Sequence, residues 1–183
     1  VFFMRTFMVD RIKDLSTTAA SKIKQEIGLV MIGAQSIADA SDHVANHLGD
    51  SSKSRATTIV RDNLSRAWAV AADGRAAQSS DAGVEMDKIW RRSGKIHSRL
   101  AHDLADGRRI PADQSFTING HQLRFPHDPA APIEETINCG CLALYRPRNT
   151  PGTIPDARPF TSDELALNPF KAQIQSGKTL ADL

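Results

Sequence analysis

Apolar residues recur at steps of three and four positions over three stretches in about the first eighty residues. This spacing is typical of amphipathic helices, because residues three and four apart lie on one helical face. We therefore expect helices over residues 8–32, 35–48 and 55–78, with Gly33 and Gly49 ending the first two. The third stretch is rich in alanine, the residue with the highest helix propensity.

The pattern changes from helical spacing to alternation after the third helix. Residues 84–90 alternate well enough for a strand. Two short β-prone segments, residues 116–118 and 122–125, flank Asn119-Gly120, the favoured pair for a type I′ hairpin turn because both positions need positive φ. The remaining predicted elements are a short helix over residues 97–104 and a final strand over residues 142–145.

Proline recurs along the C-terminal part of the chain, residues 147–183. Proline lacks a backbone N–H and disrupts helices and central strands, so this part is predicted to be an extended tail. Thr161 and Glu164 resemble a capping box, which predicts one helical turn that closes before Pro169. An ordered tail of this kind is expected to lie along a partner or back across its own domain.

These elements together predict an α+β fold with three regions. N-terminal amphipathic helices occupy residues 1–50, an Ala-rich helix and a small antiparallel β module occupy residues 51–146, and the extended tail follows. Hydrophobic residues make up 40% of the chain and charged residues 24%, which is ordinary for a globular protein. Aromatic residues make up only 5%, so aliphatic side chains must build most of the core.

The charge of the chain limits its choice of partners. A net charge of +2 argues against a surface devoted to nucleic acid, although a local basic cluster remains a candidate contact. That candidate cluster consists of Arg91, Arg92, Lys95, Arg108 and Arg109. No apolar run approaches the roughly 18 residues of a membrane span, so no membrane association is expected.

Two cysteines, Cys139 and Cys141, are separated by a single glycine. A disulfide between such close neighbours is strained, so a reducing compartment is expected, with the thiols free or bound to metal. Together with His102 and either His127 or His97 they could form a tetrahedral zinc site, since zinc prefers sulfur and nitrogen ligands. Alternatively, the cysteines are small buried residues at a tight turn. The sequence leaves both interpretations open.

A cysteine nucleophile requires a base and a group that orients the base. Cys139, His102 and Asp106 could be combined in that way. However, the sequence has no strand-to-helix nucleophile elbow, no HExxH motif and no glycine-rich phosphate loop. We therefore predict that the chain is not an enzyme. A metal-dependent or cysteine hydrolase that uses His102, Cys139 and Cys141 is the alternative.

Several short motifs occur in a fixed order along residues 27–145. They are Gly33-Ala-Gln-Ser36, Ala56-Thr-Thr-Ile-Val-Arg61-Asp-Asn63, Trp90, Arg99-Leu-Ala-His102-Asp-Leu-Ala-Asp106-Gly107, Pro111, Phe116, Pro126-His-Asp128-Pro129 and Ile137-Asn138-Cys139-Gly-Cys141. In this order they resemble the phage Mu F-like head morphogenesis proteins, the minor head or minor capsid proteins of tailed phages. The chain departs from the family pattern where Ala101 replaces Ser, Asp62-Asn63 replaces Thr-Glu, His127 replaces Gly and Gly140 replaces Arg.

The resemblance implies a structural protein of the phage head rather than a catalyst. It implies assembly in the host cytoplasm, a final location in the virion at or near the portal vertex, and the portal protein or the major capsid protein as partners. Packaged DNA is a further candidate partner. No cofactor is required by the family, and a structural zinc ion remains a candidate. The resemblance gives Arg99, Asp106, Gly107, Pro126, Asp128, Pro129 and Asn138 the role of structural motif residues.

Overall fold

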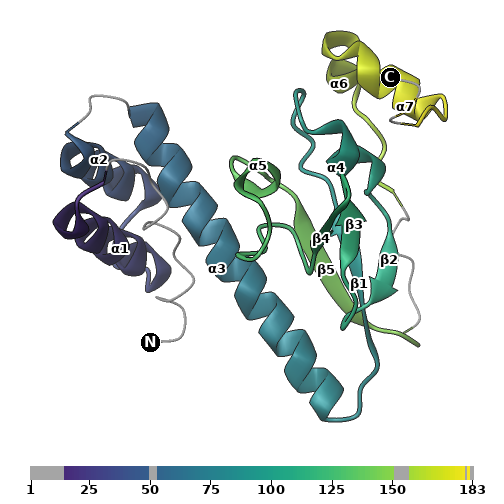
Figure 1. The fold of residues 1–183 in the computed structure, drawn as a ribbon, viewed down its shortest axis with the longest axis horizontal. Coiled ribbons are helices and arrows are strands. Elements are labelled where there is room, and N and C mark those ends of the chain that lie inside the picture. Colours follow the sequence, from purple (N-terminus) through teal and green to yellow (C-terminus); the bar gives the residue numbers. More distant parts are fainter. Residues whose placement is uncertain (1–14, 50–52, 151–156, 180, 182–183) are drawn as a thin grey trace. The chain divides into compact units, whose positions relative to one another are not determined.

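The computed structural model describes residues 15–49, 53–150, 157–179 and 181, and its fold is drawn in Figure 1. The chain divides into two compact units, Val1–Ala71 and Ala72–Leu183. The division falls inside the long third helix, α3, Lys53–Asp81. The predicted regions instead have their boundaries at residues 50 and 146.

The first unit is built from α1, Thr17–Met31, α2, Ile37–Leu48, and the first part of α3. The side-chain oxygen of Ser16 accepts a hydrogen bond from the backbone N–H of Ala19, which places the start of α1 at Thr17. The predicted helix included residues 15 and 16, and this part of the prediction is wrong because both residues precede α1. Residues 8–14 lie outside the described part of the chain. The buried apolar core of this unit consists of Ala20, Ile23, Ile27, Ala40, Val44, Ala56, Val60 and Ala67.

The second unit is organised around a three-stranded antiparallel sheet in the order β2-β1-β5. The strands are β1, Met86–Arg91, β2, Arg109–Pro111, and β5, Leu142–Pro147. A separate hairpin joins β3, Phe116–Ile118, to β4, His121–Leu123. Its turn has positive φ at Asn119 (48°) and Gly120 (78°), as the Asn-Gly pair predicted. The predicted α+β class is confirmed, whereas β2 was not predicted.

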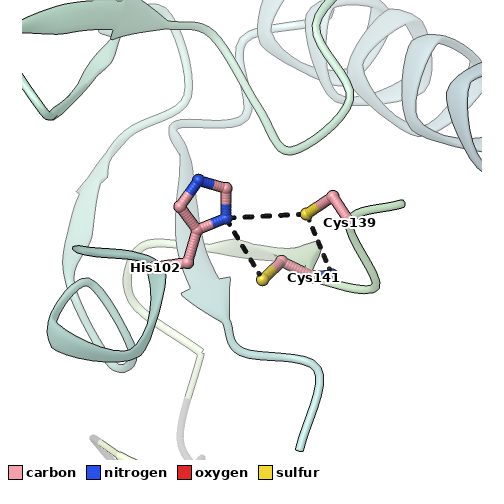
Figure 2. A group of neighbouring side chains, drawn as sticks. All are labelled: His102, Cys139 and Cys141. Carbon is pink, nitrogen blue, oxygen red and sulfur yellow. Dashed lines mark hydrogen bonds between the residues drawn. The ribbon is translucent and has the colours of Figure 1, made fainter. Parts of the chain in front are cut away.

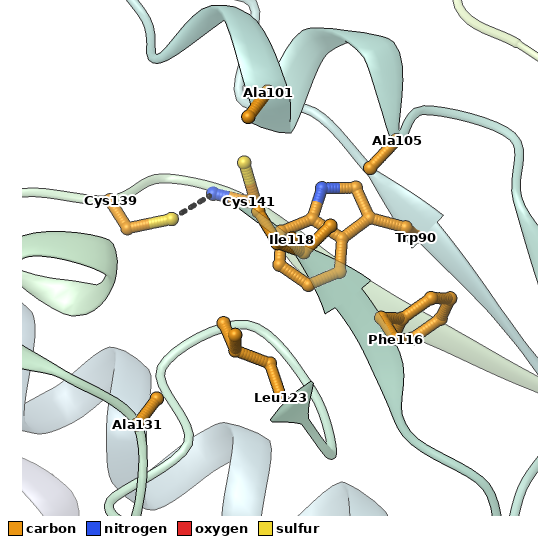
Figure 3. Close-up of a cluster of buried hydrophobic side chains, with 9 residues drawn as sticks. All are labelled: Trp90, Ala101, Ala105, Phe116, Ile118, Leu123, Ala131, Cys139 and Cys141. Atoms are coloured by element: carbon orange, nitrogen blue, oxygen red, sulfur yellow. Dashed lines mark hydrogen bonds between the residues drawn. The ribbon is translucent and has the colours of Figure 1, made fainter. Parts of the chain in front are cut away.

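The core of the second unit surrounds Trp90 on the central strand β1 (Figure 3). The indole is fully buried and makes edge-to-face contacts with Phe116, at 5.3 Å between ring centroids, and with His102, at 5.2 Å. The cluster is completed by Ala101, Ala105, Ile118, Leu123, Ala131, Cys139 and Cys141. Ala101 and His102 belong to α4, Leu100–Leu104, which is shorter than the predicted helix over residues 97–104.

The C-terminal part of the chain is not the extended tail that its prolines predicted. It forms two short helices, α6, Ser162–Leu167, and α7, Pro169–Gln175. The capping box at Thr161 is present, but the chain continues as helix beyond Asn168. Pro169 is tolerated because it occupies the first turn of α7, where its missing N–H would have had no helical partner.

Buried charges hold these helices to the rest of the second unit. Glu164 accepts hydrogen bonds from Arg92 at 2.5 Å and from Lys171 at 2.7 Å, and Lys171 lies 3.6 Å from Asp103. All four side chains are at most 2% exposed. The C-terminal segment therefore lies back across its own domain, one of the two arrangements expected for an ordered tail. Within the described residues, no helix combines the length and the apolar composition needed to cross a bilayer.

Candidate metal centre

Three potential metal ligands, His102 on α4 and Cys139 and Cys141 before β5, meet in the second unit (Figure 2). The Nδ1 atom of His102 lies 3.6 Å from the Sγ atom of each cysteine. All three ligand atoms lie within 4.8 Å of one another, and all three residues are buried. Zinc is commonly bound by such nitrogen and thiolate donors, so this cluster could hold a metal ion such as zinc.

The turn between the two cysteines brings their sulfur atoms together. A single helical turn, α5, Ile133–Thr136, precedes it, and the Cys139 N–H donates to the Thr136 carbonyl at 3.2 Å. The Cys141 N–H donates to the Cys139 Sγ atom at 3.4 Å (Figure 3). Gly140 is required by close approach, because a Cβ atom there would lie 2.8 Å from the Ser93 Cβ atom. The turn therefore directs both sulfurs toward His102.

A carboxylate fixes the orientation of the His102 ring. The Nε2 atom of His102 lies 2.8 Å from a carboxylate oxygen of Glu135, whose other oxygen accepts a bond from the Asn119 side chain at 2.9 Å. A neutral imidazole with its proton on Nε2 presents the Nδ1 lone pair to the two sulfurs. Histidine ligands in metal sites are usually held by a carboxylate in this way. Sequence reasoning did not identify Glu135, because no motif links it to His102 over 33 residues.

The electrostatics of the cluster favour a deprotonated sulfur. The hydrogen bond from the Cys141 thiol lowers the pKa of the Cys139 thiol to about 4, although burial alone would raise it. The same hydrogen bond, together with burial, raises the pKa of Cys141. Burial alone would lower the pKa of His102, but its interactions with Cys139 and Glu135 raise it. A divalent ion would take the place of the protons shared by this cluster, because metal ligands bind in their deprotonated forms.

Of the four predicted ligands, the structure brings three together. His127 is buried, with φ of 66°, but it is not part of the group of neighbouring ligand atoms among the described residues. It is close enough for its charge to lower the pKa of Cys139. His97, the other candidate, lines a pocket of about 260 Å³ that opens beside the cluster. That pocket is also lined by His102, Cys139, Cys141, Lys95 and Arg99.

The combination of Cys139, His102 and Asp106, considered as a possible triad, is not formed in the structure, because the carboxylate bonded to His102 is that of Glu135. The two oxygens of Asp106 accept hydrogen bonds from the backbone N–H groups of Arg92, at 2.9 Å, and Arg158. The two sulfurs each lie 3.6 Å from the His102 Nδ1 atom, so all three atoms could bind one metal ion.

The structural motif residues mostly bind neighbouring loops. The Arg99 side chain donates to the Ile137 carbonyl at 2.8 Å, and Lys95 donates to the Asn138 carbonyl at 2.6 Å. The Asp128 carboxylate accepts bonds from the Arg124 backbone and side chain, at 2.9 Å each, within a loop that also contains Pro126 and Pro129. Gly107 supports a turn with φ of 80°.

The candidate nucleic-acid cluster is largely occupied by interactions within the protein. Arg92 is 3% exposed and pairs with Glu164, so its predicted role as a nucleic-acid contact is wrong. Arg109 pairs with Asp87 at 2.8 Å, and Arg91 lies 3.6 Å from Asp106. The remaining members, Lys95 and Arg108, donate to the carbonyls of Asn138 and Thr117.

Comparison with known proteins finds a distant similarity to the NAD(+)–arginine ADP-ribosyltransferase EFV of Enterococcus faecalis. The two are 26% identical over 99 residues, which is 54% of this chain and 20% of that protein. The chain therefore matches about a fifth of the length of this relative. No protein-family model and no solved structure matches the chain.

Proposed function

We propose that the chain is a non-catalytic domain of a minor head protein of a tailed phage, which acts in head assembly at or near the portal vertex. The hydrogen bonds made by the motif residues support this proposal. Arg99 and Asp106 bond to backbone groups of other segments, and Asp128 bonds to the backbone of its own loop. Residues used in this way stabilise the fold, whereas catalytic residues must face a substrate.

A structural metal ion is part of the same proposal. An ion bound by His102, Cys139 and Cys141 would fasten α4 to the segment before β5, because His102 and Cys139 are 37 positions apart in the sequence. Such a link compensates for a small core, because the binding free energy of the metal adds to the folding free energy. Zinc fits the two thiolates and the imidazole.

The proposed partners are the portal protein or the major capsid protein. The C-terminal helices offer a surface for them, since Leu167 is 59% exposed and Phe170 is 47% exposed. Packaged DNA is less favoured as a partner, because Arg92 is buried and Arg109 is paired with a carboxylate. The proposed location is the virion, after assembly in the host cytoplasm.

The proposal is tested by co-expressing the tagged chain with the portal and capsid proteins of the phage that encodes it. We expect the chain to co-purify with one of them and to be present in mature heads. The double variant Leu167→Asp with Phe170→Asp should lose this association. Ile133→Asp, on α5 and also 47% exposed, is the matched control and should retain it. Normal heads that assemble without the chain and contain no copy of it would refute the proposal.

The similarity to an ADP-ribosyltransferase favours a second candidate function. The chain would then be one region of a protein that transfers ADP-ribose from NAD⁺ to arginine, an activity carried by the named relative. Incubation of the purified chain with labelled NAD⁺ and an arginine peptide tests this function. Under the head-protein proposal, neither NAD⁺ consumption nor labelled peptide is expected.

A further inference from the structure

We propose that a metal ion held by His102, Cys139 and Cys141 keeps its fourth coordination position open toward the adjacent pocket, and that this position takes a carboxylate. This inference rests on the metal site of the proposed function. It goes further by giving the site a ligand of defined chemistry. The carboxylate belongs either to a small free acid or to an acidic residue of another protein.

The number of ligands leaves one position open. Zinc is tetrahedral in most protein sites, and where the protein supplies three ligands the fourth position is left for water or another ligand. Among the described residues, no fourth His, Cys, Asp or Glu joins His102, Cys139 and Cys141. Glu135 is bonded to the far nitrogen of His102, so it orients the ligand instead of binding the ion.

The open position faces a space of suitable size. All three ligand residues line the same pocket of about 260 Å³. This volume lies just below the range of typical pockets for drug-sized ligands, roughly 300–1,000 Å³. It therefore suits a small acid or a single side chain rather than a nucleotide.

The charge of the pocket favours an anion. A divalent ion, two thiolates and one neutral imidazole have a total charge of zero. The net charge of the pocket is therefore set by the other residues that line it. Lys95 and Arg99 line the rim, and none of the described residues that line the pocket is acidic. An anion that enters this pocket therefore gains electrostatic stabilisation without meeting a fixed negative charge.

Lys95 is held in a position to bind the second oxygen of a carboxylate. Its ammonium group donates to the carbonyl oxygen of Asn138 at 2.6 Å and to the side-chain oxygen of the same residue at 3.1 Å. These two bonds leave one of its three protons for a ligand. The ammonium nitrogen also lies 3.8 Å from the position that a Cβ atom on Gly140 would take, beside the two cysteines. A carboxylate with one oxygen on the metal and the other on Lys95 fits this arrangement.

Cobalt substitution gives a direct test, because Co²⁺ binds like zinc and its visible spectrum reports its ligands. Thiolate-to-cobalt charge-transfer bands would report the two cysteines, and the d–d bands would report the fourth position. Titration with acetate should change the d–d bands saturably while the charge-transfer bands persist. Lys95→Met should weaken acetate binding about tenfold, as expected for the loss of one charged hydrogen bond. Lys22→Met, an exposed lysine in the first unit, should not.

The outcomes separate the open position from the metal site itself. Unchanged d–d bands in acetate, with charge-transfer bands present, would show a closed site and overturn the inference while the metal site stands. Absent charge-transfer bands would overturn the metal site and the inference together. A response to inorganic phosphate but not to acetate would overturn the choice of carboxylate. His127 would be identified as the fourth ligand by two results together: the cobalt spectrum changes in His127→Ala, and the unchanged protein does not respond to acetate. These results would overturn the open position.

The two sources of the carboxylate are distinguished by a second titration. A short peptide with blocked ends and one central aspartate presents the same group on a polypeptide. Binding that is tighter for this peptide than for acetate assigns the position to a residue of a partner protein. Binding that is tighter for acetate assigns it to a small free acid. Both results support the open position.

Discussion

Replacement of Glu164 by glutamine should remove the main link between the C-terminal helices and the rest of the second unit. The carboxylate is 2% exposed and accepts bonds from Arg92, Lys171 and the backbone N–H of Thr161. Burial alone would raise the pKa of Glu164, but the bonds from Arg92 and Lys171 lower it from 4.5 to about 2. At about 1.4 kcal/mol per pKa unit, this difference corresponds to about 3 kcal/mol of folding free energy.

The glutamine variant leaves two buried cations beside a neutral side chain. Removing one partner of a buried ion pair typically costs about 3–5 kcal/mol, which agrees with the value from the pKa. We therefore expect Glu164→Gln to lower the free energy of unfolding of the second unit by about 3 kcal/mol at pH 7. Because the folded-state pKa is lowered, the contribution is complete above about pH 4.5 and is lost as the pH falls toward 2.

Urea unfolding followed by the fluorescence of Trp90 measures this effect. The background variant Trp68→Phe removes the only other tryptophan, so the signal then comes from the core of the second unit. Glu134→Gln, at an exposed position of α5, is the matched control and should change stability by no more than about 0.5 kcal/mol. At pH 3 the difference between Glu164→Gln and the parent should fall to less than half.

Two results would refute this reasoning. A loss below about 1 kcal/mol at pH 7 would mean that the buried ion pair contributes no more than an exposed one. A loss of equal size at pH 7 and pH 3 would mean that the ionised carboxylate is not its source.

Hydrogen exchange should also locate the effect, with faster exchange in α6 and α7 of the variant.

Three further predictions concern the metal centre and its turn. Elemental analysis of freshly reduced protein should find one zinc ion per chain, and Cys139→Ser should contain none. Absence of zinc from the reduced parent would exclude the site. Glu135→Gln should weaken zinc binding about 10–100-fold in a competition with a chelator, because His102 loses its orienting carboxylate; equal affinities would exclude that role. Gly140→Ala should destabilise the second unit by about 1–3 kcal/mol in thermal unfolding, because its Cβ would collide with Ser93. Gly74→Ala, in α3 with no atom within 4 Å of the added Cβ, should instead be neutral or stabilising.

Sequence patterns predicted the helices and turns that depend on residues close together in the chain. The helical spacing identified α2 and α3, and Asn119-Gly120 identified the hairpin, because both depend on residues close together in the sequence. The strand β2 was missed because Arg109-Ile-Pro111 carries no alternation, and its pairing with β1 arises from tertiary contacts. The helix α6 begins at the predicted capping box and ends before Pro169, as expected, whereas α7 was missed because proline usually breaks helices, although the first turn of a helix tolerates it.

The candidate site was predictable only in part, for a similar reason. Cys139, Cys141 and His102 stood out because their side chains are typical metal ligands and are few in this chain. Glu135 could not be distinguished from its neighbour Glu134 by sequence, since only the fold places one against His102 and leaves the other exposed. The burial of Arg92 was likewise invisible, because its partner Glu164 lies 72 residues away.

The strand order β2-β1-β5 has a consequence for folding during synthesis on the ribosome. The central strand β1 is made early, but its longer partner β5 follows only after about fifty more residues. The helices of the first unit depend on near neighbours and can form as soon as they emerge, whereas the sheet must wait for distant segments. We therefore expect the nascent chain to carry a folded helical unit ahead of an open strand, with the ligand cluster completed only when Cys141 has left the exit tunnel.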